Sequence, residues 1–252
     1  MILEAAEEIE ADDDSYFVSM TDIMVGLVFI FIIMLMYFAL QFQNVTDQMT
    51  GADIERAKIL KALQQTLKSK GVEVTIYTQN GILRLPDAIL FDSAKAVLKP
   101  EGQIAVGHLA DALTEVLPCY TDQRDGGNNR PQSCGNTTHR IESVYIEGHT
   151  DTVGFNGNSG MRDNLDLSAY RATNTFRELI KDRPEIAQRC SLKATTCEAV
   201  LSVSGYGAER PIDNGTSEES RRRNRRIDLR LVMVAPDAQA AIRAVSRELN
   251  AR

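Results

Sequence analysis

One carboxylate in this chain lies where a charge is costly. Asp22 directly precedes Ile23–Leu40, a run of 18 residues without any charged side chain. As a helix, at about 1.5 Å per residue, the run reaches roughly 27 Å, close to the hydrocarbon thickness of a bilayer. A carboxylate in such a helix usually faces a partner helix or a water-filled path, where it can carry protons. The alternative is that Asp22 caps the helix or reaches back to the lipid headgroups.

The run around Asp22 predicts a single transmembrane helix over residues 15–43. Aromatic residues stand at both of its ends, as they do at membrane interfaces: Tyr16, Phe17, Tyr37, Phe38 and Phe42. Before it, residues 1–14 carry seven acidic residues and no Lys or Arg, which predicts a disordered tail and excludes the basic start of a signal peptide. The 28 remaining acidic residues match the 28 Lys and Arg, so no basic field indicates nucleic acid.

All four cysteines follow the apolar run, in polar segments. Their spacings of 15 and 7 favour two local disulfides, Cys119–Cys134 and Cys190–Cys197, among the three pairings that four cysteines allow. Disulfides indicate an oxidising compartment. We therefore expect a cytoplasmic N-terminus and a periplasmic domain after about residue 42. Four free thiols in a cytoplasmic domain are the alternative, and Arg56, the nearest basic residue, weakly favours that opposite orientation.

Residues 44–70 predict a polar linker helix. Leu60, Leu63 and Leu67 share one seam, which fits either a short two-stranded contact or packing on the following domain. Residues 71–252 then predict, in order, two strands, a helix, a strand, a helix, two strands and a helix. A mixed sheet with helices on one face is the natural packing. The expected elements are Val72–Thr78, Ile82–Leu85, a helix from Pro100, Ile141–Glu147, Leu167–Lys181, Ala199–Ser204, Ile227–Val234 and Ala238–Leu249.

Three segments carry a resemblance to a known domain. They read IEGHTD at Ile146–Asp151, NLDLSAYRA at Asn164–Ala172, and GYGAERPIDNGTSEESRRRNRRI at Gly205–Ile227. In this order they resemble the OmpA C-terminal-like domain, an α+β module that binds peptidoglycan, over roughly Val72–Val234.

The resemblance implies a site for diaminopimelate, the zwitterionic residue of the peptidoglycan stem peptide. Asp151 would be its carboxylate and Arg171 its guanidinium, which can grip a carboxylate in a bidentate fashion. Asn164, Leu167 and Ser168 would belong to the same site at the start of a helix, whose positive end favours an anion. Alternatively, Asp151 is a loop acid or the partner of a structural arginine, and Arg171 forms a salt bridge with a neighbouring acid.

Two features depart from the family pattern. Asp151 and Arg171 are 20 residues apart, so a longer loop, Phe155–Asp163, separates them, and the insertion between Cys119 and Cys134 is also extra. Five arginines, Arg221–Arg223, Arg225 and Arg226, precede the last strand. Alone they suggest nucleic acid; in the family pattern, acidic neighbours neutralise them and some line the peptidoglycan groove.

The histidines are scattered and predict no metal site, and His149 is expected to serve packing. The sequence shows no nucleophile–base pair and no phosphate loop, so we expect neither an enzyme nor a cofactor.

The membrane helix resembles that of MotB, ExbD and TolR, the smaller subunits of proton-driven motors. The flagellar version usually has a basic tail and a Trp in its membrane helix. With an acidic tail and no Trp, SMTDIMVGLVFIFIIMLM looks closer to ZorB, the MotB-like subunit of the Zorya anti-phage defence system. This implies a homodimer inside a ring of a larger MotA-like subunit, ZorA, in the bacterial inner membrane, with protons passing Asp22. A flagellar MotB-type stator, a passive OmpA-like tether and an ExbD-like transducer remain alternatives.

Overall fold

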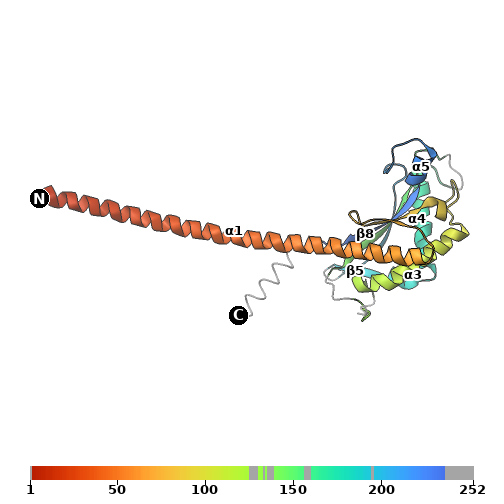
Figure 1. Cartoon of the computed structure of the whole chain (residues 1–252), viewed down its shortest axis with the longest axis horizontal. Helices are drawn as coiled ribbons and strands as arrows, with labels where there is room; N and C mark the ends of the chain where they lie inside the picture. The colour runs from red at the N-terminus through yellow and green to blue at the C-terminus, as the bar shows by residue number, and fades with distance from the viewer. Residues whose placement is uncertain are drawn as a thin grey trace. The chain divides into compact units, whose positions relative to one another are not determined.

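The computed structural model describes residues 2–124, 130–132, 134, 139–155, 160–193 and 196–235 of the 252. The chain divides into two compact units, of which the larger is Thr50–Ala235 and the other includes the residues up to Met49. Helix α1, Ile2–Ser69, contributes to both (Figure 1). The helix predicted at 238–249 lies outside the described residues.

Helix α1 begins at Ile2, so the acidic residues before the apolar run, predicted to be disordered, are helical. Its segment Ile23–Leu40 is apolar on every side. From Ile23 to Leu40 its large apolar side chains are exposed, and Asp22 is exposed on the same helix. Among the described helices, this one is long and apolar enough to cross a membrane. A helix that is apolar all round needs an apolar surrounding. The predicted apolar span is helical throughout, and its exposed apolar side chains fit a membrane-spanning segment.

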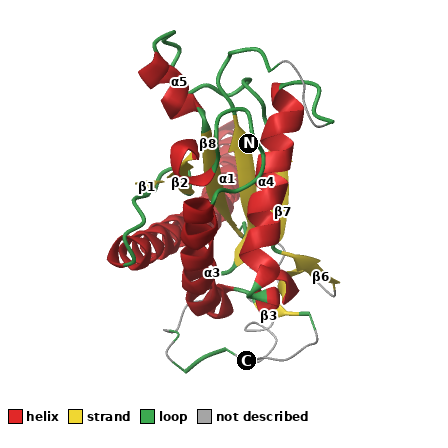
Figure 2. Ribbon diagram, turned by 90° about the vertical axis from the view of Figure 1, so that its right-hand side faces the viewer, coloured by secondary structure: helices red, strands yellow, loops and turns green. Residues whose placement is uncertain are grey.

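The larger unit is built on a mixed five-stranded sheet in the order β1-β2-β8-β4-β7 (Figure 2). Strands β4 and β7 are parallel, and the other neighbouring pairs are antiparallel. Gly81 forms the β1–β2 turn with a φ of +70°, which favours glycine. The bounds of the strands are Thr75–Tyr77 for β1, Ile82–Pro86 for β2, Ile141–His149 for β4, Leu201–Gly205 for β7 and Arg226–Met233 for β8.

Helices α3, Pro100–Tyr120, and α4, Asn164–Lys181, pack beside each other on one face of this sheet (Figure 2). The end of α1 joins the same core, because Leu60, Leu63 and Leu67 are each 0% exposed there. Of the two arrangements that the leucine seam allowed, the structure shows packing on the following domain. The predicted α+β fold, a mixed sheet with helices on one face, is confirmed.

A second, three-stranded sheet was not predicted. It joins β3, Asp122–Gln123, to β5, Arg189–Lys193, and β5 to β6, Thr196–Ala199. Its strands are too short and polar to show an alternating pattern. The disulfide Cys190–Cys197 joins β5 to β6 within this sheet, and both disulfides, this one and Cys119–Cys134, have the predicted pairing.

The short elements between the strands were also missed. They are α2, Asp87–Leu90, the 3-10 helix Pro184–Gln188, and α5, Glu218–Asn224. α5 begins at Ser217, whose hydroxyl accepts a hydrogen bond from the backbone N–H of Ser220. Each is a turn or two long, below the length at which a helical period can be recognised. Two of them, α2 and α5, supply residues to the candidate site.

Candidate functional site

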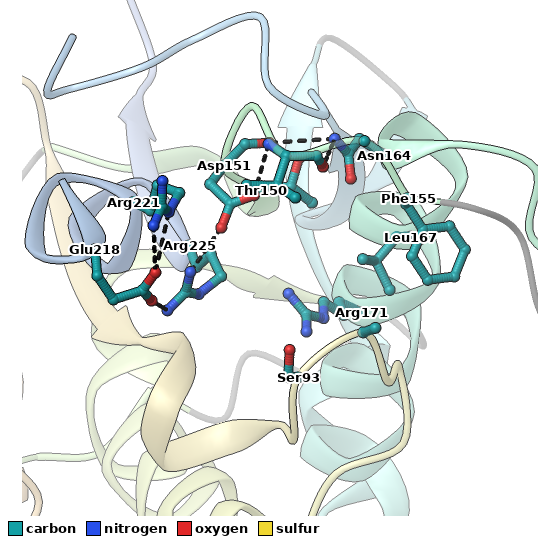
Figure 3. A pocket seen from close by; sticks show the side chains of 13 residues that line it. Ser93, Thr150, Asp151, Phe155, Asn164, Leu167, Arg171, Glu218, Arg221 and Arg225 are labelled. Carbon is teal, nitrogen blue, oxygen red and sulfur yellow. Dashed lines mark hydrogen bonds and ion pairs between the residues drawn. The ribbon is translucent and has the colours of Figure 1, made fainter. Parts of the chain in front are cut away.

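A cavity of about 560 Å³ opens where β4 ends and α4 begins. We call it the pocket. Charged side chains from three separate segments line it (Figure 3). Its lining residues are Ser93, Ala94, Thr150, Asp151, Val153, Gly154, Phe155, Asn164, Leu167, Arg171, Glu218, Arg221 and Arg225.

Close backbone contact between β4, β7 and α4 positions the pocket. A Cβ atom at Gly148 would collide with the backbone carbonyl of Ser168 in α4. A Cβ atom at Gly205 would come within 2.7 Å of the backbone of Ala169. Glycine therefore lets the ends of β4 and β7 lie directly against the first turns of α4. The glycines of IEGHTD and GYG are thus needed for packing.

Asp151 lies just after β4 and is 8% exposed. One carboxylate oxygen, Oδ1, accepts the backbone N–H of Val153 at 3.0 Å. The other, Oδ2, lies 2.6 Å from Nη1 of Arg225. The predicted anion of the site is therefore in the pocket wall and is held by one arginine.

Arg171 reaches the pocket from α4 and is 1% exposed (Figure 3). Its Nη1 lies 3.0 Å from Oδ1 of Asp87, an ion pair without hydrogen-bond geometry. Its Nε donates to the carbonyl of Lys95 at 2.9 Å and Nη2 to that of Asp92 at 3.2 Å. Arg171 thus supports a loop and pairs with a neighbouring acid, as the structural alternative expected, and it also lines the pocket.

Asp87, from α2, is the buried partner of Arg171. Burial raises the pKa of Asp87 to about 6, although the charge of Arg171 opposes this shift. Asp87 and Arg171 are 84 positions apart in the chain. No local pattern could have paired them.

Helix α5 and the residue after it add a cluster of ion pairs around Glu218 to the pocket wall. The sequence predicted only that some arginines of this run line the groove. Arg225 contacts Asp151 and also Oε1 of Glu218 at 2.8 Å, while Nε of Arg221 donates to Oε2 of Glu218 at 3.0 Å. These two hydrogen bonds lower the pKa of Glu218. The basic run before the last strand was expected to line the groove in part, and Arg221 and Arg225 do so. Arg223 instead pairs with Asp213 outside the lining.

The three other predicted site residues, Asn164, Leu167 and Ser168, have different roles around the pocket. The amide of Asn164 donates to the carbonyls of Asp151 at 3.2 Å and Val153 at 2.9 Å, so it fixes the loop that carries the predicted anion. Leu167 lines the pocket. Ser168 is 0% exposed and is not among the lining residues; its hydroxyl accepts the N–H of Gly207 at 2.8 Å.

A second charged cluster, which we call the sheet cluster, lies on the sheet face opposite the apolar core. Along β8, Ile227, Leu229 and Leu231 belong to the core, while the alternate residues face the other way. The members of the cluster are Arg84, Glu147, His149, Asp228, Arg226 and Arg230.

Glu147, His149 and Asp228 place their ligand atoms within 4.8 Å of one another, a separation that a metal ion could bridge. Arginines already bind both carboxylates: Arg84 grips Asp228 at 2.7 and 2.8 Å, and Arg230 grips Glu147 at 2.8 Å through both oxygens. Burial, followed by the charge of Arg226, lowers the pKa of His149 to about 3. The ring stacks on Tyr206 at 5.3 Å between centroids. The cluster has the contacts of a structural ion-pair network.

The pocket combines both signs of charge around an open volume. Its described lining includes three arginines, Arg171, Arg221 and Arg225, and two acids, Asp151 and Glu218. Arginine suits planar carboxylates, and an isolated carboxylate suits an ammonium group. Such a lining fits a ligand that carries both groups.

The fold and this site define a class: a chain with an OmpA-like α+β domain that follows a helix of membrane-spanning length. The OmpA family model matches residues 133–225. This range contains Asp151, Arg171 and Arg225, and it begins after the Cys119–Cys134 loop has almost closed.

The relatives are more specific. The chain is 27% identical over 254 aligned positions to the Zorya protein ZorB of Escherichia coli, covering 94% of each chain. It is 28% identical to Motility protein B of Bacillus subtilis over 75% of its own length, and it spans only 60% of that protein. Among solved structures, a MotB-like protein from Desulfovibrio vulgaris aligns at 21% identity with a TM-score of 0.49, over 79% of this chain and 97% of the other. The predicted resemblance to ZorB is confirmed.

Proposed function

We propose that this chain is the peptidoglycan-anchored, proton-conducting subunit of a rotary motor of the bacterial inner membrane, used in anti-phage defence. The observation that carries the anchor part is the pocket, where Asp151 and Arg171 line one cavity. The match to ZorB along 94% of both chains supports the defence part.

In the pocket, the ligand is the diaminopimelate of a stem peptide. Its ammonium group takes the place of Arg225 at Oδ2 of Asp151, and its carboxylate binds Arg225 and the part of Arg171 that lines the pocket. The hydrogen bonds of Arg171 to the carbonyls of Asp92 and Lys95 use two of the five N–H donors of a guanidinium. The ligand therefore replaces one ion pair, between Asp151 and Arg225, with three, and Glu218 holds Arg225 in place during the exchange.

In the membrane, Asp22 carries the proton. A charge that crosses a potential of 100 mV releases about 2.3 kcal/mol, which a motor can use only if a group accepts the proton on one side and releases it on the other. We infer a homodimer inside a ring of a larger MotA-like subunit, because an isolated carboxylate on a lipid-facing helix is costly and needs a partner helix. The two disulfides support a periplasmic location of the domain and, with it, a cytoplasmic location of residues 1–14.

The test is a phage-infection assay with the complete system and the Asp22→Asn variant. Asn has nearly the same shape but cannot take up and release a proton, so we expect normal membrane insertion and assembly but no protection. Asp22→Glu is expected to retain part of the protection. Protection by Asp22→Asn equal to that of the wild type would show that the carboxylate does not carry protons, and would favour a passive tether.

A flagellar stator is the second candidate, because the chain also matches a motility protein over 75% of its length. Complementation separates the two. A strain that lacks its own MotB and regains swimming when it receives this chain would support the flagellar function. Protection from phage without swimming supports the defence function.

A further inference from the structure

A second cavity of about 560 Å³ adjoins the pocket, and we call it the side cavity. It shares Ser93 and Ala94 with the pocket, so one loop forms a wall of both. Its other described lining residues are Lys95, Ala96, Val97, Met161, Tyr170 and Asn174.

Side chains of α4 hold the shared loop in a fixed conformation. Arg171 binds the carbonyls of Asp92 and Lys95, and the amide of Asn174 donates to the carbonyl of Ala96 at 2.7 Å. Between these anchors Ala94 has a φ of +57°, a left-handed conformation that a residue with a Cβ atom rarely adopts. Such strain is retained mainly where the surroundings impose it, and it concentrates at ligand sites.

The chemistry of the side cavity differs from that of the pocket. Lys95 is the one charged side chain among its described lining residues, whereas five charged side chains line the pocket. Tyr170 is 48% exposed and Val97 is 72% exposed, although both are large and apolar. Tyr170 and Asn174 lie one helical turn apart on α4, so an aromatic ring and an amide group line the side cavity from the same face of this helix. An uncharged ligand with one apolar face and several hydroxyl groups fits this lining.

We propose that the side cavity binds a sugar ring of the glycan strand while the pocket holds the stem peptide. This rests on the proposed peptidoglycan-binding function. A stem peptide in the pocket is covalently attached to the glycan, so a sugar must lie nearby. The side cavity, which shares the wall at Ser93 and Ala94 with the pocket, gives the sugar a place, with Tyr170 stacked on the ring.

The test compares two ligands: the tetrapeptide that contains diaminopimelate, and the same tetrapeptide attached to its disaccharide. Binding is measured by calorimetry with the full chain in detergent. For the wild type, we expect the disaccharide to tighten binding roughly three- to tenfold, the range that a stacked aromatic contact supplies. Tyr170→Ala should remove this gain while binding the bare tetrapeptide as the wild type does. Tyr170→Phe should keep the gain, because the ring remains.

Ile104→Ala is the matched control, since Ile104 is also a large exposed residue on a helix, at 61% against 48% for Tyr170, and lies outside both cavities. A Tyr170→Ala variant that keeps the full gain from the disaccharide overturns the side-cavity proposal alone. A wild type that binds neither ligand overturns the peptidoglycan function itself.

Discussion

This domain contains two clusters of arginine and carboxylate, the pocket and the sheet cluster, and the same two sequence motifs contribute residues to both. IEGHTD places Glu147 and His149 in the sheet cluster and Asp151 in the pocket. The arginine run places Arg225 in the pocket, while its neighbour Arg226 binds Asp228 in the sheet cluster. Which cluster a side chain joins depends on strand alternation and on where the strand ends.

The two clusters differ in whether their carboxylates are still accessible to a ligand. In the sheet cluster, Asp228 is 1% exposed and both of its oxygens accept hydrogen bonds from arginines. Burial raises its pKa, but hydrogen bonds from Arg84 and the charge of Arg226 outweigh this and hold the pKa below its usual range. In the pocket, Asp151 has a single arginine contact at the wall of an open cavity. A charged cluster can bind a ligand only where its partners can be exchanged and water can enter.

The largest effect that we expect is a loss of folding stability when the sheet cluster is disrupted. Asp228→Asn leaves the buried guanidinium of Arg226 and the half-buried one of Arg84 without their shared counter-charge, which should lower the free energy of unfolding by about 3–5 kcal/mol. The matched variant Asp151→Asn, at the pocket wall, should lower it by roughly 1 kcal/mol or less. Urea unfolding followed by circular dichroism measures both. Equal losses would contradict the distinction between the two clusters.

The second prediction concerns pH and Asp87. Its pKa is raised from 3.8 to about 6, so the folded chain holds this proton more tightly than the unfolded chain. Its contribution to stability is therefore greatest below about pH 4 and is lost as the pH rises through 6. The difference amounts to about 3 kcal/mol, from 1.36 kcal/mol per pKa unit.

Asp87→Asn isolates this contribution because the amide does not titrate. The unfolding free energy of the wild type, minus that of Asp87→Asn, should fall between pH 4 and pH 7. A difference that stays constant over this range would mean that Asp87 is not buried as the structure shows. Other carboxylates titrate equally in both chains, so they cancel from the comparison.

The sequence alone was sufficient to predict those parts of the fold that depend on a local pattern. The strand pair around Asn80-Gly81 could be predicted from turn chemistry, and the helix from Pro100 from its apolar period. The disulfide pairing could be predicted because both loops are short. Resemblance placed Asp151 and Arg171 together, and the structure has both in the lining of one cavity.

The sequence was insufficient where partners are distant or elements are short. The pairing of Arg171 with Asp87 joins α4 to a four-residue helix, which has no period of its own. Ser168 shares the motif of Arg171 but serves to hold Gly207, a backbone contact that no pattern encodes. The side cavity depends on a left-handed residue, Ala94, where glycine would be expected and would have signalled the turn.

The central claim is that the pocket binds peptidoglycan through Asp151, and co-sedimentation with purified peptidoglycan tests it most directly. The wild-type chain in detergent should sediment with peptidoglycan and be released by free diaminopimelate. Asp151→Asn should stay in the supernatant. Asp111→Asn is the control, because Asp111 is also a paired carboxylate, held by Lys70 and Arg183, but lies outside the pocket. It should sediment as the wild type does. Sedimentation of Asp151→Asn to the same extent as the wild type and Asp111→Asn would contradict the account.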